Sequence, residues 1–539
     1  MVSQETGEIS MKIRVAAFAL AMMAGACAAL APGSVAPGAV STGLSNVVKL
    51  DSGYVSGLNG PVRIYKGIPY AAPPVGALRW KPAQSAARWE GIKTAVSFGP
   101  ECISGRGVTP TSSEDCLNLN VWTPAQAAGA KLPVMVWIHG GAYESGSGIM
   151  PLFDGTALAS QGMVVVTINY RLGMFGFFSH PELSAESPDG VSGNQGVTDM
   201  IQSLKWVQAN IGGFGGDKDN VTIMGESAGG TSMGLLLLSP KANGLFHKAV
   251  ASSPWGFLHP STHVKKTWYG RKPAEEAGAA LGTLADLRAK SAPDIVAIPR
   301  TPMASPTMHQ VVDGLIIPDD PTVLWREGRI NRAKLIVGTN RDEGTIFTQS
   351  VATLEEAKKR VGDSVGPNSD GLLAVYGATT DAGAEAANFD IMRDSWFSVG
   401  ARQMARSADM ASDVWQYEFT RVNGAGVRGK VGAFHTAEIP YFLRNLPAAP
   451  YIANRTGPLQ LGDFAAIDEA LSLGMSNYLL NFIKTGDPNG AGLKAWPKFG
   501  DGGERYMEFG EVGFTVKSDL RKKELDAVEA LFLDRLAKR

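Results

Sequence analysis

Six short apolar runs, separated by segments with helical spacing, constrain the fold of this chain more than any other feature. The runs begin at Pro133 (PVMVWIHGG), Met163 (MVVVTINYR), Asn220 (NVTIMGES), His247 (HKAVASS), Ala333 (AKLIVGTN) and Asp413 (DVWQYEFTRV). Continuous apolar runs of this length are typical of strands that are buried on both faces. Residues 197–211 and 228–240 have the pattern of helices. This alternation predicts an α/β fold with a mostly parallel central sheet, helices on both faces and long inserted loops.

The body of the chain is expected to form one domain. It has no linker, internal repeat or low-complexity tract within its 539 residues. We therefore assign residues 37–539 to a single domain, with a packed amphipathic helix over residues 518–539. Charged residues make up 19% of the chain and the formal net charge is -1. This balance argues against nucleic acid or an anionic membrane surface as the main partner.

Residues 1–36 have the pattern of a signal peptide. Two basic residues follow Met11, which we take as the start, and an uncharged apolar run covers residues 15–31. A basic start, a short apolar core and small residues before a cleavage point are typical of secretory signals. Cleavage is expected after Ala28 or Ala36, which would export the mature protein to the periplasm or the medium. An uncleaved anchor and lipidation at Cys27 are the less favoured alternatives, so we expect no stable membrane insertion.

Two of the three cysteines remain after cleavage. Cys102 and Cys116 form an even pair in a compartment that we expect to be oxidising. We predict a disulfide between them, which would stabilise the fold by roughly 3 kcal/mol in the chain-entropy model. The alternative is a pair of buried free thiols. Their short separation and the lack of a nearby histidine argue against zinc, and no metal site is expected.

The stretch VTIMGESAGG places one serine between two glycines, after an apolar run and before a helical pattern. A strand, a Gly-x-Ser-x-Gly turn and a helix form the nucleophile elbow of serine hydrolases. The turn is tight, so side chains at Gly225 and Gly229 would collide with the strand or the helix. Ser227 is therefore the predicted nucleophile, and an ordinary glycine-rich turn is the alternative.

A serine nucleophile needs a base, and chain order selects one of the seven histidines. In folds with this elbow the order along the chain is serine, acid, histidine. Asp342 and Glu343 follow the expected strand KLIVGTN, and His435 is the only histidine beyond them. His435 is thus the predicted base and Glu343 the predicted acid, with Asp342 as the second candidate. His259 or His309 could serve only if the acid lay earlier in the chain.

Acyl transfer also requires donors for the oxyanion of the tetrahedral intermediate. The segment HGGAYESGSG follows the expected strand PVMVWI, and its backbone N–H groups would lie near the nucleophile. The N–H of Ala228, at the start of the elbow helix, is the expected additional donor. We expect His139 to be a structural residue of this loop.

With these residues in place, the chain resembles the type-B carboxylesterases, the α/β-hydrolase family of carboxylesterases, cholinesterases and para-nitrobenzyl esterases. The resemblance runs from about residue 47 to residue 509. The motifs that carry it are YKGIPYAAPPVGALRWKPAQ (65–84), SEDCLNLNVWTP (113–124), the stretch from GNQGV to the elbow (193–230), VVDGLIIPDDP (311–321) and NFIKTGDPN (481–489).

The resemblance implies a Ser-His-Glu triad of Ser227, His435 and Glu343, which favours Glu343 over Asp342 as the acid. It implies a secreted serine esterase that hydrolyses small-molecule carboxylic esters through an acyl-enzyme, without a metal or organic cofactor. The alternatives are a lipase on long-chain esters, an amidase or thioesterase with the same triad, and a non-catalytic binding protein on the same fold.

The resemblance also implies residues around the triad. Gly141 and Ala142 match the oxyanion loop and Ala228 its third donor. Ser253 matches a serine that supports the acid. Glu226 matches a carboxylate beside the nucleophile, which would either stabilise the protonated histidine or belong to a buried hydrogen-bond network.

The chain departs from the family pattern at the oxyanion loop and at the disulfide loop. Ala142 stands where the family usually has glycine, and Tyr143 where phenylalanine is common. The loop between Cys102 and Cys116, which matches the first disulfide of the family, holds no aromatic residue. Cholinesterases carry a tryptophan there for the quaternary ammonium group, so a choline-ester specialist is not expected. Four aromatic residues in inserts would either line the pocket or pack in the core: Trp255, Phe257, Trp396 and Phe397.

Overall fold

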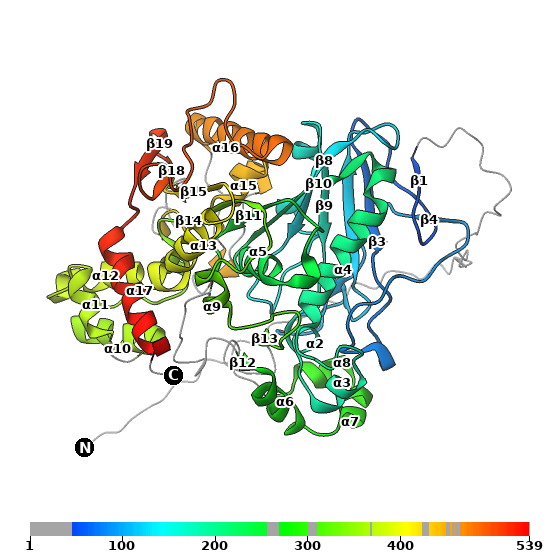
Figure 1. The fold of residues 1–539 in the computed structure, drawn as a ribbon, viewed down its shortest axis with the longest axis horizontal. Helices are drawn as coiled ribbons and strands as arrows, with labels where there is room; N and C mark the ends of the chain where they lie inside the picture. Colours follow the sequence, from blue (N-terminus) through cyan, green and yellow to red (C-terminus); the bar gives the residue numbers. More distant parts are fainter. Residues whose placement is uncertain are drawn as a thin grey trace, which may run out of the picture.

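A ten-stranded sheet runs through the centre of the computed structural model (Figure 1). The structure describes residues 46–255, 269–299, 310–366, 369–422, 431–448, 453–454, 457–458 and 464–537. The predicted signal peptide over residues 1–36 therefore lies outside the described residues. The strand order in the sheet is β19-β18-β15-β14-β11-β10-β8-β9-β7-β3.

The six predicted strands form the parallel centre of this sheet. Every pairing from β9 through β8, β10, β11, β14 and β15 to β18 is parallel, whereas β3, β7 and β19 are antiparallel strands at the two edges. The strands are β3 (Arg63–Pro69), β7 (Asn118–Thr123), β8 (Leu132–Ile138), β9 (Val164–Ile168), β10 (Gly216–Glu226), β11 (Lys248–Ser252), β14 (Lys334–Asn340), β15 (Val414–Phe419), β18 (Arg505–Gly510) and β19 (Gly513–Ser518). Short strands make four small sheets: β1 (Val47–Lys49), β2 (Tyr54–Ser56), β4 (Ile92–Thr94), β5 (Glu101–Cys102), β6 (Ser112–Ser113), β12 (Tyr269–Gly270), β13 (Val311–Val312), β16 (Ala453–Asn454) and β17 (Gly457–Pro458).

Both faces of the sheet are covered, because successive side chains of its strands point to opposite sides. In β8, Val134 and Val136 join the core cluster that contains helices α4 and α5, whereas Met135 and Trp137 join the cluster that contains α15 and α16. The helices are α1 (Thr156–Ala159), α2 (Gly173–Gly176), α3 (Pro181–Glu186), α4 (Gln195–Asn210), α5 (Ala228–Leu238), α6 (Arg271–Ala279), α7 (Leu284–Ala289), α8 (Ala292–Val296), α9 (Pro321–Arg326), α10 (Leu354–Val365), α11 (Asp370–Val375), α12 (Asp381–Arg393), α13 (Val399–Asp409), α15 (Ile439–Phe442), α16 (Ala466–Thr485) and α17 (Lys522–Ala537).

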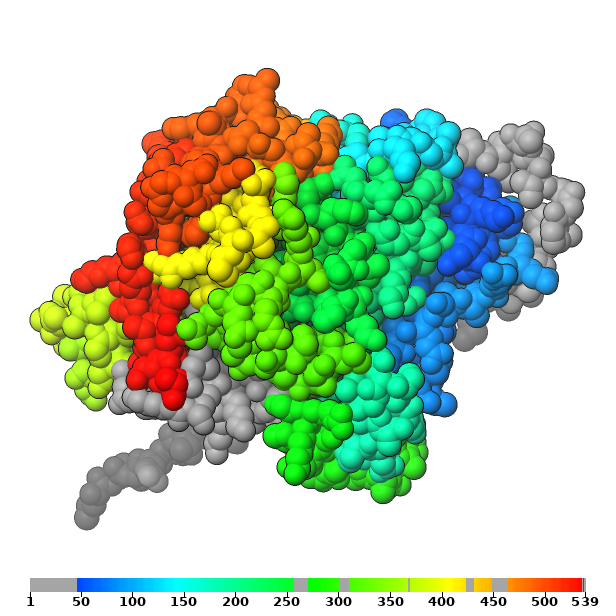
Figure 2. Space-filling model, viewed as in Figure 1, coloured from blue at the N-terminus to red at the C-terminus, as the bar shows by residue number. Residues whose placement is uncertain are grey.

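The C-terminal helix begins later than the sequence predicts. Residues up to Ser518 form the edge strand β19, and α17 starts at Lys522. Leu525, Val528 and Phe532 of α17 pack in a core cluster with α10 to α12. In Figure 2 this helix, in red, lies beside the yellow-green segment that holds those helices. The prediction of a packed terminal helix therefore holds, but its first residues belong to the sheet.

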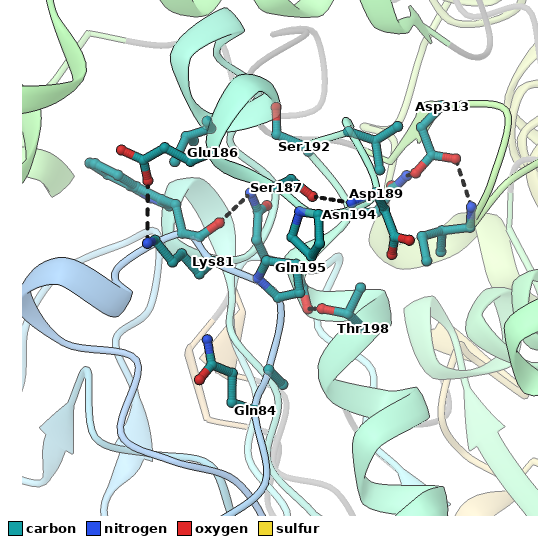
Figure 3. A pocket seen from close by; sticks show the side chains of 18 residues that line it. Lys81, Gln84, Glu186, Ser187, Asp189, Ser192, Asn194, Gln195, Thr198 and Asp313 are labelled. Carbon is teal, nitrogen blue, oxygen red and sulfur yellow. Dashed lines mark hydrogen bonds and ion pairs between the residues drawn. The ribbon is translucent and has the colours of Figure 1, made fainter.

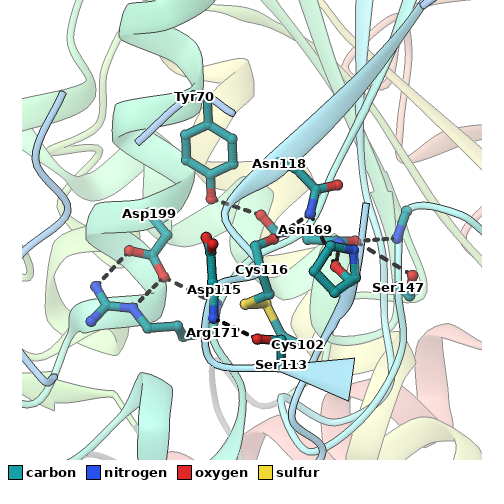
Figure 4. Close-up of a disulfide and its surroundings, with 12 residues drawn as sticks. Tyr70, Cys102, Ser113, Asp115, Cys116, Asn118, Ser147, Asn169, Arg171 and Asp199 are labelled. Atoms are coloured by element: carbon teal, nitrogen blue, oxygen red, sulfur yellow. Dashed lines mark hydrogen bonds and ion pairs between the residues drawn. A yellow bond between two sulfur atoms is a disulfide. The ribbon is translucent and has the colours of Figure 1, made fainter. Parts of the chain in front are cut away.

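The predicted disulfide between Cys102 and Cys116 is present and buried (Figure 4). Asn118 Nδ2 donates a hydrogen bond to the carbonyl oxygen of Cys116 at 3.0 Å. Close by, Arg171 and Asp199 form a buried ion pair with a shortest N–O distance of 2.6 Å. The disulfide thus fixes the loop of residues 102–116 beside the buried ion pair of Arg171 and Asp199.

Replacing both Cys102 and Cys116 by serine is expected to lower the free energy of unfolding by roughly 3 kcal/mol, because the loop between them would be free in the unfolded chain. The melting temperature of the double variant, measured by calorimetry, should fall below that of the wild type. Reductant should shift the wild type in the same direction and leave the variant unchanged. Equal melting temperatures for the two proteins would contradict the prediction.

Within the described part of the chain, we find no helix with the length and apolar character needed to cross a membrane.

Candidate active site

Ser227 lies in the sharp turn between β10 and α5. The strand ends at Glu226, the helix begins at Ala228, and Ser227 itself has φ 59° and ψ -123°. Its backbone N–H donates a hydrogen bond to the carbonyl oxygen of Ser252 at 3.0 Å, which anchors the turn to β11. A positive φ is costly for a residue with a side chain, so the surrounding contacts must hold this conformation.

The two glycines of the motif are required by close backbone contacts. A Cβ atom on Gly225 would lie 2.6 Å from the carbonyl carbon of Gly229, and one on Gly229 would lie 2.1 Å from the oxygen of Ile138. Gly230, which was not among the predicted glycines of the turn, is equally confined, since its Cβ would lie 2.2 Å from the oxygen of Ser252. The elbow is therefore packed between β8 and β11 with no room for side chains at these positions.

His435 and Glu343 are in direct contact. His435 Nδ1 lies 2.5 Å from Glu343 Oε2, and both side chains are buried. The other carboxylate oxygen of Glu343 accepts hydrogen bonds from Ser253 Oγ at 2.5 Å and from the backbone N–H of Asn340 at 2.7 Å. Because a carboxylate only accepts hydrogen bonds, Nδ1 carries the ring proton and Nε2 is left to act as a base.

Glu226 lies on the other side of the imidazole ring. Its Oε1 is 3.0 Å from His435 Nε2, although the two atoms are not aligned as a hydrogen bond. Burial raises the pKa of Glu226 well above its usual value, and the negative charge of Glu343 raises it further. Each ring nitrogen of His435 thus has a buried carboxyl group beside it.

The loop that carries His435 is bound to the loop that carries Glu343. The backbone N–H of Asp342 donates to the oxygen of Ala433 at 3.0 Å, and the N–H of Ala433 donates to Asp342 Oδ2 at 2.7 Å. Thr345 Oγ1 also donates to the oxygen of Val431 at 2.8 Å. Asp342, the second candidate for the acid, is therefore occupied in joining the two loops.

A third buried carboxyl group, Glu438, lies behind this pair. Asn340 Nδ2 donates to Glu438 Oε2 at 2.5 Å and to the oxygen of Phe434 at 2.7 Å. Burial and then the charges of Glu226 and Glu343 raise the pKa of Glu438 to about 8. Glu438 was not predicted from the sequence, although its position three residues after His435 was the available signal.

Replacing Glu438 by glutamine is expected to flatten the dependence of stability on pH. Because its pKa rises from 4.5 to about 8 on folding, Glu438 holds its proton in the folded chain at pH values where the unfolded chain has lost it. Its contribution to stability is therefore full below pH 4.5 and is lost as pH rises through about 8, at a slope of at most about 1.4 kcal/mol per pH unit.

The check on this prediction is the melting temperature between pH 5 and pH 8.5. The wild type should lose more stability over this range than Glu438→Gln, whose amide is neutral throughout. Glu355→Gln, which removes an exposed carboxylate from α10, serves as the matched control and should follow the wild type. Parallel curves for the wild type and Glu438→Gln would refute the assignment.

The predicted oxyanion loop packs directly against the nucleophile. A Cβ atom on Gly140 would lie 3.0 Å from Ser227 Cβ. The backbone then turns through three residues with positive φ, namely Gly141 (109°), Ala142 (57°) and Tyr143 (59°). Ala228 is the first residue of α5, so its N–H has no acceptor within the helix. The N–H of Ala228 therefore lies at the elbow, and the predicted oxyanion loop packs against Ser227 through Gly140.

His139 has the surroundings of a structural residue. Its ring stacks on Tyr170 with centroids 4.4 Å apart, and the Tyr170 hydroxyl donates to the oxygen of His139 at 2.9 Å. Burial lowers the pKa of His139 to about 4, so the ring is neutral at neutral pH. His247 lies beside the middle of β10, away from the elbow, where its Nδ1 accepts from the N–H of Val221 at 3.1 Å. His259, His263 and His309 lie outside the described residues.

Aromatic rings surround His435. Phe397 and Phe347 lie with their ring centroids 4.7 Å and 5.0 Å from the imidazole, and Trp396 lies 5.7 Å from Phe347. Trp396 and Phe397 belong to a short π-helix, Asp394–Ser398, inserted between α12 and α13. Trp255 contacts Trp396 at 6.2 Å. Of the four predicted aromatic residues, Phe257 lies outside the described residues. Phe347 was not predicted, because it follows the short 3-10 helix that begins at Glu343 and has no periodic pattern around it.

This arrangement provides the groups for nucleophilic attack on a carbonyl carbon. Ser227 lies in a strained turn at a helix start, a buried imidazole contacts the carboxyl group of Glu343, and the N–H of Ala228 at the first helical position has no acceptor within the helix. Across the described ranges, no group of three or more His, Cys, Asp or Glu side chains has an arrangement that could hold a metal ion.

Comparisons with known proteins agree on one family. A model of the carboxylesterase family matches residues 44–528. The fumonisin B1 esterase of Sphingopyxis macrogoltabida is 38% identical over 479 residues, which cover 86% of each chain. The para-nitrobenzyl esterase of Bacillus subtilis is 34% identical over 81% of this chain and 89% of its own.

Solved structures give the same result. A PNB esterase superposes with a TM-score of 0.75 at 30% identity, and the match covers 89% of this chain and 99% of that protein. A carboxylesterase of Geobacillus stearothermophilus has the same TM-score at 32% identity, with coverage of 90% and 99%.

Proposed function

Because the chain belongs to the carboxylesterase family, has the predicted α/β-hydrolase fold and is a carboxylic ester hydrolase, we propose that it works through a catalytic triad of Ser227, His435 and Glu343. The observation that carries this proposal is the 2.5 Å contact between His435 Nδ1 and Glu343 Oε2. This contact leaves Nε2 as the basic atom of the buried imidazole. Nε2 lies 3.0 Å from Glu226, the residue directly before Ser227 in the chain, so it faces the elbow.

The proposed reaction has two steps. Ser227 Oγ attacks the ester carbonyl while His435 Nε2 takes the hydroxyl proton, and Glu343 stabilises the imidazolium that forms. His435 then returns the proton to the leaving alcohol, which leaves an acyl-enzyme on Ser227. A water molecule, deprotonated by His435, attacks the acyl-enzyme and releases the carboxylic acid, with the proton returning to Ser227.

The negative oxygen of each tetrahedral intermediate would be held by the backbone N–H groups of Gly141, Ala142 and Ala228. Such donors are in position before the reaction starts, so they need no reorganisation during it. Removing one of them typically raises the activation free energy by about 3–4 kcal/mol. The alanine at position 142 keeps its N–H, so the methyl group would narrow access to the ester without removing a donor.

Glu226 would assist His435 when the ring is protonated. Burial disfavours the ionised form of Glu226, but a protonated imidazole 3.0 Å away would favour it, and the resulting carboxylate would stabilise the charged ring. Because the imidazole is charged only as the intermediate forms, this interaction would stabilise the transition state more than the resting enzyme.

The proposed substrates are small-molecule carboxylic esters with apolar acyl groups. The rings of Phe347, beside His435, and of Trp396, in contact with Phe347, offer apolar surface to such a group, whereas Phe397 is fully buried behind His435. The names of the relatives make fumonisin B1 and para-nitrobenzyl esters the first compounds to test. The disulfide loop has no aromatic residue, which argues against a choline ester.

We also propose that the enzyme is exported. The support is the signal-like pattern of residues 1–36 together with the Cys102–Cys116 disulfide, since such bonds persist in oxidising compartments. N-terminal sequencing of the mature protein from a cell fraction would test this, and an intact Met11 on cytosolic protein would refute it.

The experiment that tests the esterase proposal combines a substrate panel with covalent labelling. p-Nitrophenyl esters from acetate to palmitate should be hydrolysed best at short chain length, whereas a lipase would prefer the long chains and respond to an interface. Diethyl p-nitrophenyl phosphate should abolish activity and add one diethylphosphoryl group to the peptide that holds Ser227. No hydrolysis of any ester would point to a binding protein, and a label on another residue would contradict the proposed nucleophile.

A further inference from the structure

The short π-helix Asp394–Ser398 carries the rings of Trp396 and Phe397. It joins α12 directly to α13, so the three segments form one continuous helix. The N–H of Val399 donates to the oxygen of Asp394, five residues earlier, which makes a wider turn than that of an α-helix. Such turns are rare and are frequently found at functional sites. The wide turn also sets the direction in which the two rings leave the helix.

Arg521 binds both ends of this π-helix. Its Nε donates to Asp394 Oδ1 at 3.1 Å, and its Nη2 donates to Ser398 Oγ at 3.0 Å. Its Nη1 donates to Glu418 of β15. Arg521 lies in the connection between β19 and α17, 127 residues after Asp394 in the chain. One guanidinium group thus joins the first and the last residue of the π-helix to the central sheet.

Asp394 is a fully buried carboxylate with three donors. Besides the bond from Arg521, it accepts from Arg393 Nε at 2.7 Å and from the Tyr376 hydroxyl at 2.9 Å. Burial alone would raise the pKa of Asp394, but the charges of Arg393 and Arg521 lower this pKa well below its usual value. The carboxylate is therefore charged at neutral pH, and it attracts Arg521 throughout the range in which an esterase is assayed.

The two ends of the π-helix are held differently. At the first end, Arg393 Nη1 donates to the backbone oxygen of Arg341 at 3.1 Å, which connects the helix to the loop that carries Glu343. At the last end, the Ser398 hydroxyl has one hydrogen-bond partner among the described residues, and that partner is Arg521. The last end therefore depends on Arg521 more than the first end does.

The rings of the π-helix lie where the proposed function places the acyl group of the ester. Phe397 packs on His435 and is buried, whereas Trp396 and Phe347 are partly exposed and lie 5.7 Å apart. Trp396 Nε1 donates to Ser364 Oγ of α10 at 3.1 Å, so one edge of this ring is fixed by a second helix. A shift of the π-helix would move the backbone of Trp396 relative to that fixed edge and change the apolar surface beside Phe347.

We propose that Arg521 is a positioning residue that sets the acyl-group preference of the enzyme by holding both ends of the π-helix. Without the guanidinium, Ser398 loses its partner and Asp394 loses one of its charged donors, so the wide turn can relax toward α-helical geometry. Longer acyl groups then lose apolar contacts with Trp396, whereas an acetyl group has little apolar surface to lose. This inference rests on the proposed function, in which the partly exposed rings contact the acyl group.

The test compares the hydrolysis of p-nitrophenyl hexanoate with that of p-nitrophenyl acetate. The acyl ratio, defined as kcat/KM for hexanoate divided by kcat/KM for acetate, should fall at least tenfold in Arg521→Gln, because each methylene in an apolar pocket typically changes kcat/KM by about 10–200-fold. Ser398→Ala removes only the bond at the last end and should lower the acyl ratio at least threefold. This milder variant decides the question if Arg521→Gln does not fold.

Two matched variants control for a general loss of stability. Arg402→Gln removes another guanidinium that joins α13 to the C-terminal part of the chain, through Asp526 at 2.7 Å, but the Arg402 side chain makes no hydrogen bond to a described residue of the π-helix. Ser395→Ala removes a hydroxyl of the π-helix that bonds to Met392 and not to Arg521. Both variants should keep the acyl ratio within twofold of the wild type, although Arg402→Gln should lower the melting temperature.

A separate cavity of about 420 Å³ is the alternative place for a longer acyl group (Figure 3). Trp80, Leu183 and Ile316 make part of its wall apolar, and none of the described residues that line it belongs to the π-helix. Val191→Trp, which fills this cavity, should leave the acyl ratio unchanged. A ratio that falls in Val191→Trp and stays constant in Arg521→Gln would place the acyl group in the cavity and overturn the proposal.

A folded Arg521→Gln variant with an acyl ratio within twofold of the wild type would also overturn the proposal. An equal fall in Arg402→Gln would do the same, because it would attribute the change to lost stability. Labelling with diethyl p-nitrophenyl phosphate separates this inference from the proposed triad. If every variant is labelled at Ser227, an unchanged ratio rejects the role of Arg521 alone, whereas a label on another residue rejects the triad as well.

Discussion

Replacing Ser227 by alanine is expected to lower kcat for p-nitrophenyl butyrate by about 10⁵–10⁶-fold, as when a serine nucleophile is removed from a comparable triad. The change removes Oγ, the atom that would form the bond to the acyl group. Alanine keeps the Cβ atom and places no new strain on the turn, whose φ of 59° is already held by the N–H bond to Ser252. The melting temperature should therefore stay at the wild-type value while turnover is lost.

Ser239→Ala is the matched control for this experiment. Ser239 is a buried serine that immediately follows the other end of the same helix, and its Oγ has no hydrogen-bond partner among the described residues. Ser239→Ala should keep activity within about twofold, because the change removes no hydrogen bond to a described residue and a substitution without such a loss changes stability little. If Ser227→Ala retains activity within tenfold of the wild type, the elbow does not carry the nucleophile.

Replacing Glu343 by glutamine is expected to lower kcat by on the order of 10⁴-fold, the loss seen when a triad carboxylate becomes an amide. The Oε1 position can still accept from Ser253 and from the N–H of Asn340. The group that faces His435 Nδ1 then becomes an NH₂ donor, which favours the wrong tautomer of the ring and removes the charge that stabilises the imidazolium. Stopped-flow measurement of the acylation burst would show whether the lost step is the attack by serine.

Asp342→Asn distinguishes the two neighbouring carboxylates. The asparagine keeps an oxygen that can accept from the N–H of Ala433, so the two loops should stay joined and activity should fall less than about tenfold. The reverse ranking, a severe loss in Asp342→Asn and a mild one in Glu343→Gln, would make Asp342 the acid.

Much of this fold could be predicted from the sequence because its central strands are continuous apolar runs with helices between them. The positions of Ser227, Glu343 and His435 followed from chain order and from the family resemblance, and the structure places Glu343 and His435 in contact. The glycines of the elbow could be explained in advance because a tight turn between a strand and a helix leaves no room for a Cβ atom at these positions in any chain. The disulfide pairing followed from the number of cysteines and was confirmed.

Other features could not be predicted, because they depend on partners that are distant in the chain. The strands β3, β7 and β19 pair antiparallel with their neighbours, and their register is fixed only when these pairings form. Glu438 and Asn340 are isolated polar residues whose hydrogen bond forms only when two loops meet. The π-helix of Trp396 and Phe397 leaves no periodic pattern in five residues.

The groups around the nucleophile come from two separate parts of the chain. Ser227 and the glycine loop follow β10 and β8, whereas Glu343 and His435 follow β14 and β15, and β11 joins the two parts by pairing with both β10 and β14. A growing chain that has been synthesised only as far as β11 holds the proposed nucleophile without the proposed base. Under the proposed mechanism, ester hydrolysis can therefore begin only after residue 435 has been synthesised and has packed beside Glu343, so the partly synthesised chain is inactive.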